Sequence, residues 1–403
     1  MIKRLAMLLV LIASAADARA ADATLQRRIE QALESAGGYL VARQSPDGAW
    51  RSGVHGSFRD GAGLTPHVMT TLYFLASEHP PAAESIERGL QFLIAITDEQ
   101  GQLRPGVAQL SFPVYSSAEI SWVLAMCDRM RHPAIERAWI ARLRERQLNA
   151  ARGWDRQDPE FGGWGYSPAI PRKLPAGARG LMVDSNLSAT VFALGALRVA
   201  RVPRDDPVWR DALVFIDRCQ NFQDDPLRRD ERYDDGGFFF MPADAARNKP
   251  GAVPGSGQPG AGERYHSYGT MTADGVRAML ACGRRHDHPR VVAAGQWLAR
   301  NFDASSNPGR FNPDRQFLRE SSYYYWVWSA SHAMTRLGLR EIQTTRGRID
   351  WRVALVEELL RRQRSDGSWA NDASGLKEDD PLVATPFAAA ALVVCYDSLY
   401  RGR

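Results

Sequence analysis

Cysteine is scarce in this chain, which argues against a metal site built on thiolates. There are only four cysteines, Cys127, Cys219, Cys282 and Cys395, and none belongs to a C-x-x-C pair. Each falls inside an apolar helical pattern, which is typical of a small buried residue. We therefore predict no metal ion and no cofactor, and the spacing does not define any disulfide pairing.

A strong excess of charge is also missing. The formal net charge is +5, from 51 basic and 46 acidic residues that are scattered along the chain. Nucleic-acid binding needs a concentrated basic surface. Short runs such as Arg228-Arg229 and Arg361-Arg362 are typical of solvated helix faces, so we predict no nucleic-acid partner.

Long hydrophobic runs are absent except at the N-terminus. There, Lys3 and Arg4 precede an apolar run from Leu5 to Ala16, followed by Ala18-Arg19-Ala20. The run is too short to span a bilayer, and the pattern is that of an export signal with an A-x-A cleavage site. We predict a signal peptide at 1–20 and a mature chain at 21–403 that forms one exported domain, periplasmic or secreted, without a transmembrane segment.

What the chain does contain is a repeat. Gln44-Ser45-Pro46-Asp47-Gly48-Ala49-Trp50 returns with the same spacing, Q-x-x-D-G-x-W, as Gln363-Arg364-Ser365-Asp366-Gly367-Ser368-Trp369. A weaker copy surrounds Trp164, and another runs from Gln223, after an insertion, to Asp234-Asp235-Gly236-Gly237-Phe238. Self-similarity at a long period predicts a repeat architecture.

Apolar periodicity predicts twelve helices of two alternating classes. Amphipathic helices are expected at Leu25–Arg43, Ala82–Ile96, Pro133–Gln147, Pro207–Gln220, Pro289–Asn301 and Asp350–Gln363. Helices with few charges are expected at Thr65–Ala76, Val114–Met130, Asp184–Ala200, Ser267–Cys282, Ser321–Leu337 and Ala384–Tyr400. A helix with so few charges must be covered on most sides. The alternation therefore predicts an all-α fold, an (α/α)6 toroid of six outer and six inner helices.

The connections between these helices differ in length. Inner-to-outer turns are mostly short and begin at proline, whereas outer-to-inner links are long and carry the repeat copies. Two links hold insertions, Ser167–Val183 and the Pro/Gly-rich Pro242–Gly262. In a closed ring all long links emerge at one rim, above the inner-helix N-termini. Long loops are commonly functional, so we place the candidate site at this rim, with Pro242–Gly262 as a lid.

The Q-x-x-D-G-x-W copies resemble the repeat of the squalene–hopene cyclase and protein prenyltransferase superfamily. The resemblance covers the whole mature chain, and it implies that Gln44 with Trp50 and Gln363 with Trp369 tie neighbouring helical hairpins together. It is specific for the terpenoid-cyclase toroid and says little about chemistry.

The chain departs from both activities of that superfamily. The resemblance implies a D-x-D-D acid at the start of one inner helix, but Asp184 is followed by Asn186 and Leu187 where acids are expected. The zinc of the prenyltransferases is held by Asp, Cys and His around the ring mouth, whereas the cysteines here lie late in the inner helices. The sequence therefore predicts a toroid without cyclase or prenyltransferase chemistry.

Polar and aromatic residues are expected to gather around the funnel. Glu119 is an acid within an otherwise uncharged helix, and burial would shift its pKa or that of Asp274 toward acid–base use. The candidates for catalysis are Glu119, Asp184, Asp274 and His266. The candidates for ligand binding are His67, Tyr115, Asn186, Arg264, Tyr265, Tyr268, Tyr324, Trp328 and His332.

Each candidate also has a structural interpretation. At helical spacing Tyr324, Trp328 and His332 form one stripe, which suits either a cavity wall or a packed core. His67 and Asp184 stand at predicted helix starts and equally suit capping.

Three functions remain open. The leading hypothesis is a protein that binds an apolar or isoprenoid-like ligand in the aromatic funnel. The second is an exported carbohydrate-active α/α-barrel enzyme, a lyase or glycosidase. The third is a structural or partner-binding ring whose core is plugged by Tyr324, Trp326 and Trp328. Whether the chain is an enzyme is left open by the sequence.

Overall fold

The computed structural model describes residues 2–75, 80–98, 100, 102–104, 110–127, 131–175, 183–242, 244–256, 263–345 and 347–402. Side chains are described from residue 22 onward, except at positions 80 and 374. Parts of both predicted insertions (176–182, 243 and 257–262) and the end of the helix predicted at Val114–Met130 lie outside the described residues. The side chains of the predicted signal peptide, 1–20, lie outside them as well.

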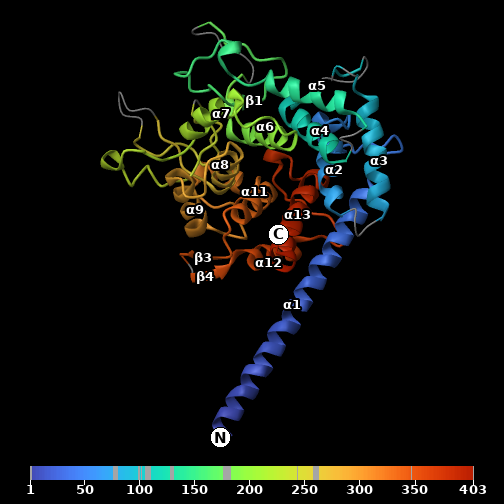
Figure 1. Ribbon diagram of the computed structural model, residues 1–403, viewed down its shortest axis with the longest axis vertical. Coiled ribbons are helices and arrows are strands. Elements are labelled where there is room, and N and C mark those ends of the chain that lie inside the picture. Colours follow the sequence, from blue (N-terminus) through green and yellow to red (C-terminus); the bar gives the residue numbers. More distant parts are fainter. Residues whose placement is uncertain are drawn as a thin grey trace.

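Six inner helices form a closed ring. They are α2 (Leu64–Leu75), α4 (Pro113–Cys127), α6 (Leu187–Val199), α8 (Gly269–Ala281), α11 (Tyr323–Arg336) and α13 (Pro381–Tyr396). Each contacts the next in this order, and α13 contacts α2. The predicted toroid is therefore confirmed, and Figure 1 shows it with the chain colours running once around the ring.

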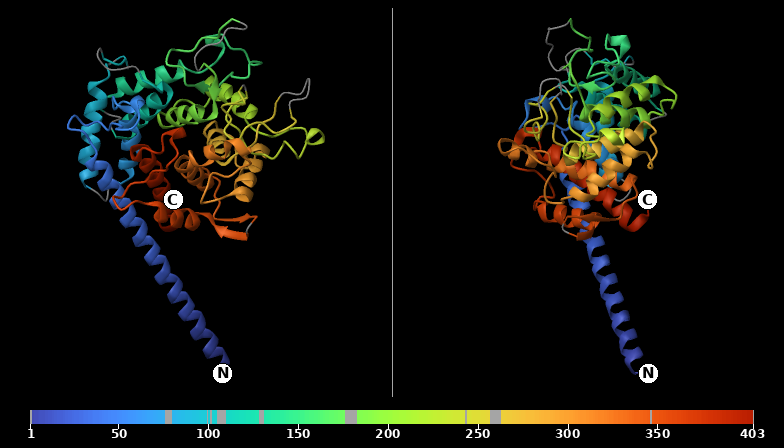
Figure 2. Two further views of the ribbon diagram at one scale, coloured as in Figure 1. Left: turned by 180° about the vertical axis from the view of Figure 1, so that it is seen from behind. Right: turned by 90° about the vertical axis from the view of Figure 1, so that its left-hand side faces the viewer.

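Six outer helices surround them. They are α1 (Ile2–Ala42), α3 (Pro80–Ala95), α5 (Pro133–Arg144), α7 (Pro207–Arg218), α9 (Pro289–Asn301) and α12 (Trp351–Arg362). Proline begins four of these helices, where its missing N–H would have no partner anyway. The N-terminal half of α1 projects away from the ring in every view (Figure 2).

Glutamine clamps fasten four hairpins to their neighbours. In each clamp the amide Nε2 donates to the carbonyl of a glycine in the following link and to a carbonyl on the next outer helix. The clamps are Gln44 with Gly48 and Ser85 (2.9 and 2.8 Å), Gln147 with Gly162 and Val208 (2.9 and 3.0 Å), Gln220 with Gly236 and Arg290 (2.9 and 2.9 Å), and Gln363 with Gly367 and Ala32 (3.0 and 2.9 Å). The last of these reaches α1 and so joins the two ends of the ring.

The aromatic residue of each copy extends the clamp inward. The indole N–H groups of Trp50, Trp164 and Trp369 donate to carbonyls of the preceding outer helix at 2.6 to 2.8 Å. The backbone N–H of each aromatic residue, Phe238 included, donates to a threonine hydroxyl in the first turns of the inner helix. Each link is thus fixed to both helices that it joins.

The structure differs from the sequence expectations in three places. The third clamp uses Gln220 rather than Gln223. The connection from α11 to α12 is not a short turn but a hairpin of β3 (Glu341–Thr344) and β4 (Gly347–Asp350). In the link before α6, β1 (Trp164–Gly165) pairs with β2 (Ser185–Asn186).

Short helices complete the links. They are α10 (Gln316–Glu320), five single turns at Gly56–Phe58, Ala150–Arg152, Pro226–Arg228, Pro313–Arg315 and Ser374–Leu376, and a final turn at Asp397–Arg401.

One segment of the described chain is long and apolar enough to cross a membrane by length and composition alone. It is Pro381–Arg401, which contains the inner helix α13, and 61% of its apolar window is buried within the ring. The absence of a transmembrane segment therefore stays a prediction.

Candidate functional site

An aromatic plug fills the middle of the lumen. It consists of Phe192, Tyr325, Trp328 and Phe387, from three inner helices. Tyr325 stacks on Trp328 at 5.6 Å between ring centroids, and Phe192 and Phe387 lie 5.5 and 5.2 Å from Trp328. Such contacts add about 0.5–1.5 kcal/mol per pair beyond area burial.

The plug differs by one helical position from the stripe that we expected on α11. Tyr325, Trp328 and His332 face the lumen, whereas the Tyr324 hydroxyl donates to the carbonyl of Ala370 and its ring packs on Tyr323. Trp326 likewise points outward, with its indole N–H on the carbonyl of Asp303. Tyr324 is therefore not part of the lumen wall.

A chain of hydroxyl groups runs through the lumen to a buried acid. Tyr325 donates to Asp274 Oδ2 at 2.6 Å, and this fixes the direction of the bonds behind it. Ser188 lies 3.1 Å from the Tyr325 hydroxyl, Tyr115 lies 2.6 Å from Ser188, and Tyr166 lies 3.2 Å from Tyr115. With every hydroxyl donating toward the acid, the arrangement can pass a proton from the half-buried Tyr166 to Asp274.

Asp274 is fully buried on α8 and carries three donors. Besides Tyr325, it accepts from Ser329 Oγ at 2.5 Å and from Arg277 at 3.2 Å. Burial raises the pKa of Asp274 to about 6, although Arg277 and the two hydroxyls oppose the shift. Near neutral pH this carboxyl can therefore either hold or release a proton.

His67 and Glu119 form a second buried pair, between α2 and α4. His67 Nδ1 lies 2.9 Å from Glu119 Oε1, and Nε2 lies 3.2 Å from the carbonyl oxygen of Val383. Both ring nitrogens therefore face acceptors, which fits a doubly protonated ring. Burial alone would lower the pKa of His67, but the Glu119 carboxylate and the hydrogen bonds outweigh it and raise the pKa. The pair joins three inner helices rather than capping α2.

Below the plug the lumen keeps a small hollow of about 30 Å³. Its wall consists of His67, Thr70, Thr71, Phe74, Glu119, Trp122, Trp328, His332, Pro386, Phe387 and Ala390. Apart from His67, which lies in the first turn of α2, these residues come from the middle and C-terminal halves of the inner helices, so the hollow faces the rim of the short turns. We expected the site at the opposite rim. Burial and the charges of Arg277 and Arg336 lower the pKa of His332 well below its usual value, so its ring is neutral.

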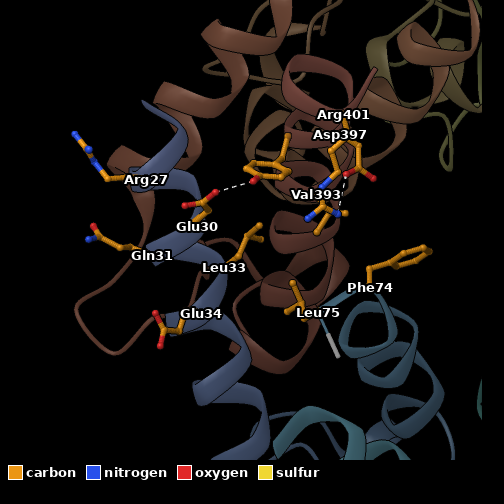
Figure 3. Close-up of a pocket in the computed structure, with 11 residues that line it drawn as sticks. Arg27, Glu30, Gln31, Leu33, Glu34, Phe74, Leu75, Val393, Asp397 and Arg401 are labelled. Atoms are coloured by element: carbon orange, nitrogen blue, oxygen red, sulfur yellow. Dashed lines mark hydrogen bonds and ion pairs between the residues drawn. The ribbon is translucent and has the colours of Figure 1, made fainter. Parts of the chain in front are cut away.

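A larger hollow of about 390 Å³ lies beside it, between α1, the end of α2 and the end of α13. Figure 3 shows Leu33, Leu75 and Val393 on its wall, with Glu30 and Glu34 on the α1 side. Glu30 accepts from the Tyr396 hydroxyl at 2.6 Å. Phe74 lines both hollows and is 46% exposed, so the two hollows share one wall residue.

Several predicted site residues lie at the long-link rim, away from the hollows. Asn186 caps α6 by accepting from the N–H of Ala189 at 2.8 Å, a role that we considered for Asp184. Asp184 instead pairs with Arg247 at 3.2 Å. Arg264 is exposed near the Tyr233 ring.

The segment from Tyr265 to Tyr268 packs under the links. Tyr265 contacts Phe239, and burial and nearby Arg310 lower the pKa of the half-buried His266. Tyr268 is fully buried beside Phe311.

The sequence did not point to two charged residues near this rim. Glu378 is 1% exposed and accepts from the N–H groups of Tyr324 and Tyr325 at 2.9 and 2.8 Å and from Asn371 at 2.9 Å. Burial raises the pKa of Glu378 to about 8, whereas these three donors favour the carboxylate. The second is Lys249. It is one of only four lysines in the chain, and this rarity is the one feature of the sequence that could have drawn attention to it.

Within the described residues, no group of three or more His, Cys, Asp or Glu side chains is placed to hold a metal ion. Cys219 and Cys395 are fully buried, and Cys127 and Cys282 are half-buried.

No protein-family model matches the chain, and no curated protein matches it. Among solved structures, it is similar to a variant of the type II terpene cyclase MstE from Scytonema in complex with merosterolic acid A. The TM-score is 0.56 and the identity 12%, over 93% of this chain and 98% of that one. A protein from Actinoplanes matches with a TM-score of 0.52 and 13% identity, over 92% and 99%.

An inactive α-1,6-mannanase of Salegentibacter in complex with α-1,6-mannotriose matches more loosely. Its TM-score is 0.49 and its identity 10%, over 92% of this chain and 99% of that one. At these identities the likeness is one of fold: the chain is an all-α toroid, a fold that it shares with a type II terpene cyclase.

Proposed function

We propose that the chain is an exported, single-toroid protein that binds an elongated apolar, isoprenoid-like molecule without cyclising it. One observation carries this proposal. The lumen below the plug is lined by aromatic and apolar side chains, Trp122, Phe387, Ala390 and Phe74, that stay partly exposed at the centre of the ring. Concave apolar surface left open to water is typical of a ligand site, and covering it would contribute about 25 cal/mol per Å².

The two hollows together suit a long ligand. The lumen hollow alone accepts only the end of a chain, because about 30 Å³ is the share of one water molecule. The hollow on α1, at about 390 Å³, lies in the range of small-molecule sites. A rotation of Phe74 would join them, so that the apolar end lies against Trp328 and the other end reaches the charged side chains of α1.

The absence of cyclase chemistry rests on the residues of the acid motif. Where the resemblance implies a run of acids, the chain has only Asp184, whose carboxylate Arg247 engages at the opposite rim. We therefore assign binding, rather than substrate protonation, to the lumen. Export is proposed from Lys3, Arg4, the apolar run and the A-x-A site.

The test is to export the full-length chain, purify the mature form and extract whatever it holds for mass spectrometry. A co-purified isoprenoid or other apolar lipid would support the proposal. A bound sugar would support the carbohydrate-active alternative, and an empty protein that farnesol does not stabilise against heat would support a partner-binding ring. The N-terminal peptide of the same sample reports whether 1–20 is removed.

A matched pair of variants locates the site. Ala390→Trp fills the lumen hollow, whereas Ala83→Trp places the same ring on the exposed face of α3. We expect Ala390→Trp to abolish the quenching of intrinsic fluorescence by farnesol, while Ala83→Trp binds as the wild type does. Unchanged farnesol binding in a folded Ala390→Trp protein would contradict the proposed site.

A further inference from the structure

Lys249 occupies an unusual position for a lysine. It belongs to the predicted lid insertion, yet its ammonium nitrogen lies over the rings of Phe240 and Tyr268, at 5.1 and 6.0 Å from their centroids. Its side chain forms no hydrogen bond or ion pair with any residue that the structure describes. The residue as a whole is half-buried.

The backbone around Lys249 is fixed rather than loose. The buried Asn248 side chain accepts from the N–H groups of Phe240 and Met241 at 2.8 and 3.2 Å, and it donates to the carbonyls of Met241 and Asp244 at 2.8 and 2.9 Å. On the other side, the Asn312 N–H donates to the carbonyl of Pro250 at 2.9 Å. Hydrogen bonds on both sides therefore hold the backbone at Lys249 in place.

A second polar group at the same place also lacks a partner. The Tyr268 side chain is fully buried, and its hydroxyl makes no hydrogen bond within the described part of the chain. A buried hydroxyl without a partner costs about 1–3 kcal/mol. A ligand oxygen beside Lys249 would satisfy it.

The electrostatics fit an amine that reacts at neutral pH. Burial lowers the pKa of Lys249 to about 8, although Glu378 and Asp274 oppose the shift. A desolvated lysine of this kind is the form in which the side chain acts as a nucleophile.

We propose that Lys249 is a reactive amine that captures an aldehyde or ketone as an imine at the long-link rim of the ring. The nitrogen lone pair attacks the carbonyl carbon, and the amine proton passes to the carbonyl oxygen to give a carbinolamine. That oxygen then leaves as water with a second proton, so the balance is amine plus carbonyl to imine plus water. No oxidant or cofactor is needed, and this site is independent of the proposed lumen ligand at the opposite rim.

The test is alkylation of the purified, full mature chain with hexanal and sodium cyanoborohydride, followed by peptide mass spectrometry. The chain supplies its own controls. Lys173 is solvent-exposed and paired with Asp158 at 2.5 Å, which raises its pKa, and Lys377 lies near the Phe58 ring. At pH 7 we expect Lys249 to be modified at least about tenfold faster than Lys173, because a larger fraction of its amine is unprotonated. Its rate should reach half its maximum near pH 8.

Two variants complete the design. Lys249→Met should remove the fast-reacting amine, and Lys249→Arg should do so while keeping the positive charge over Phe240. Both should bind farnesol as the wild type does, which separates this inference from the lumen proposal. Modification of Lys249 no faster than that of Lys173 and Lys377, or a rate that rises only near pH 10, would overturn it. If hexanal bound but left no reduced adduct on Lys249, and could be washed away, the proposal would also be overturned.

Discussion

The four glutamine clamps, together with the links that they hold, form a seam around the outside of the ring. In this seam the same neutral side-chain amide, that of Gln44, Gln147, Gln220 or Gln363, makes the same pair of hydrogen bonds four times. In the lumen, the buried polar side chains differ from helix to helix and include two groups with raised pKa values, His67 beside Glu119 and Asp274 beside Arg277. A hydrogen bond between neutral groups holds at any pH, whereas a buried titratable pair holds only while its protonation states match. We therefore expect the contribution of the four glutamine clamps to stability to be independent of pH, and that of the lumen pairs to change with pH.

The largest effect is expected from a glycine of the seam. Gly162 has a φ of +94°, and a Cβ there would overlap the carbonyl oxygen of Asp211 on α7. Because both backbone strain and a clash with rigid backbone result, Gly162→Ala should lower the free energy of unfolding by about 4 kcal/mol. Urea unfolding at pH 5 and pH 8 should give the same loss.

Gly38→Ala is the matched control for this substitution. Gly38 is exposed on α1, and a Cβ there would meet no atom within 4 Å, so alanine should stabilise the helix by about 0.5–1 kcal/mol. A loss for Gly162→Ala no larger than about 1 kcal/mol would mean that the links can move away from the outer helices.

In the lumen, Glu119→Gln should destabilise the protein by about 3 kcal/mol, because it leaves a buried His67 cation without its carboxylate. The pKa of His67 is raised in the folded state, so its contribution is complete below about pH 6.5 and is lost as the pH rises through the folded pKa. The penalty should therefore be larger at pH 5.5 than at pH 9. An equal penalty at the two pH values in urea unfolding would show that His67 is neutral throughout.

Two glutamines of the seam sharpen the comparison. Gln147 is 2% exposed, whereas Gln44 is half-buried, and both make the same two bonds. Because an unpaired carbonyl costs more where water cannot reach it, Gln147→Ala should cost about 2 kcal/mol and Gln44→Ala about 1 kcal/mol. Midpoints of urea unfolding measure both, and neither should depend on pH. A larger loss at Gln44 would reverse the assumed role of burial.

Sequence alone predicted the ring well because its seam repeats. The spacing Q-x-x-D-G-x-W marks Gln44 and Gln363, where glutamine and glycine are four residues apart. Gln147 and Gln220 make the same clamp, but insertions separate each from its glycine, so the spacing no longer identifies them. A hydrogen-bond geometry can be kept while the loop that spans it grows, since loop length costs little.

The lumen was harder to predict because its residues do not repeat. On α11, aromatic residues occupy every position from Tyr323 to Trp326, so periodicity gives no phase, and the inward face was placed at Tyr324 rather than Tyr325. Asp274 was singled out, yet its two hydroxyl partners lie on α11, and the hydroxyl chain behind Tyr325 runs through three further segments of the chain. Lys249 lies in a Pro/Gly-rich insertion, where no periodic pattern applies.

The smallest change at neutral pH is expected for Asp274→Asn, and its sign should change with pH. The pKa of Asp274 is raised to about 6 in the folded state, so its stabilising contribution is complete below about pH 3.8 and is lost as the pH rises through 6. The neutral amide should therefore be the less stable of the two at pH 4, where the protonated acid keeps its hydrogen bonds. It should come within about 1 kcal/mol of the wild type, or exceed it, at pH 8, because a buried charge has been removed. Ser329→Ala serves as the control, since it removes a donor without removing the charge. The measurement is the midpoint of urea unfolding for the wild type and the two variants at pH 4 and pH 8. If the difference in stability between Asp274→Asn and the wild type were the same at both pH values, Asp274 would be ionised throughout, and the hydroxyl chain would end on a fixed charge.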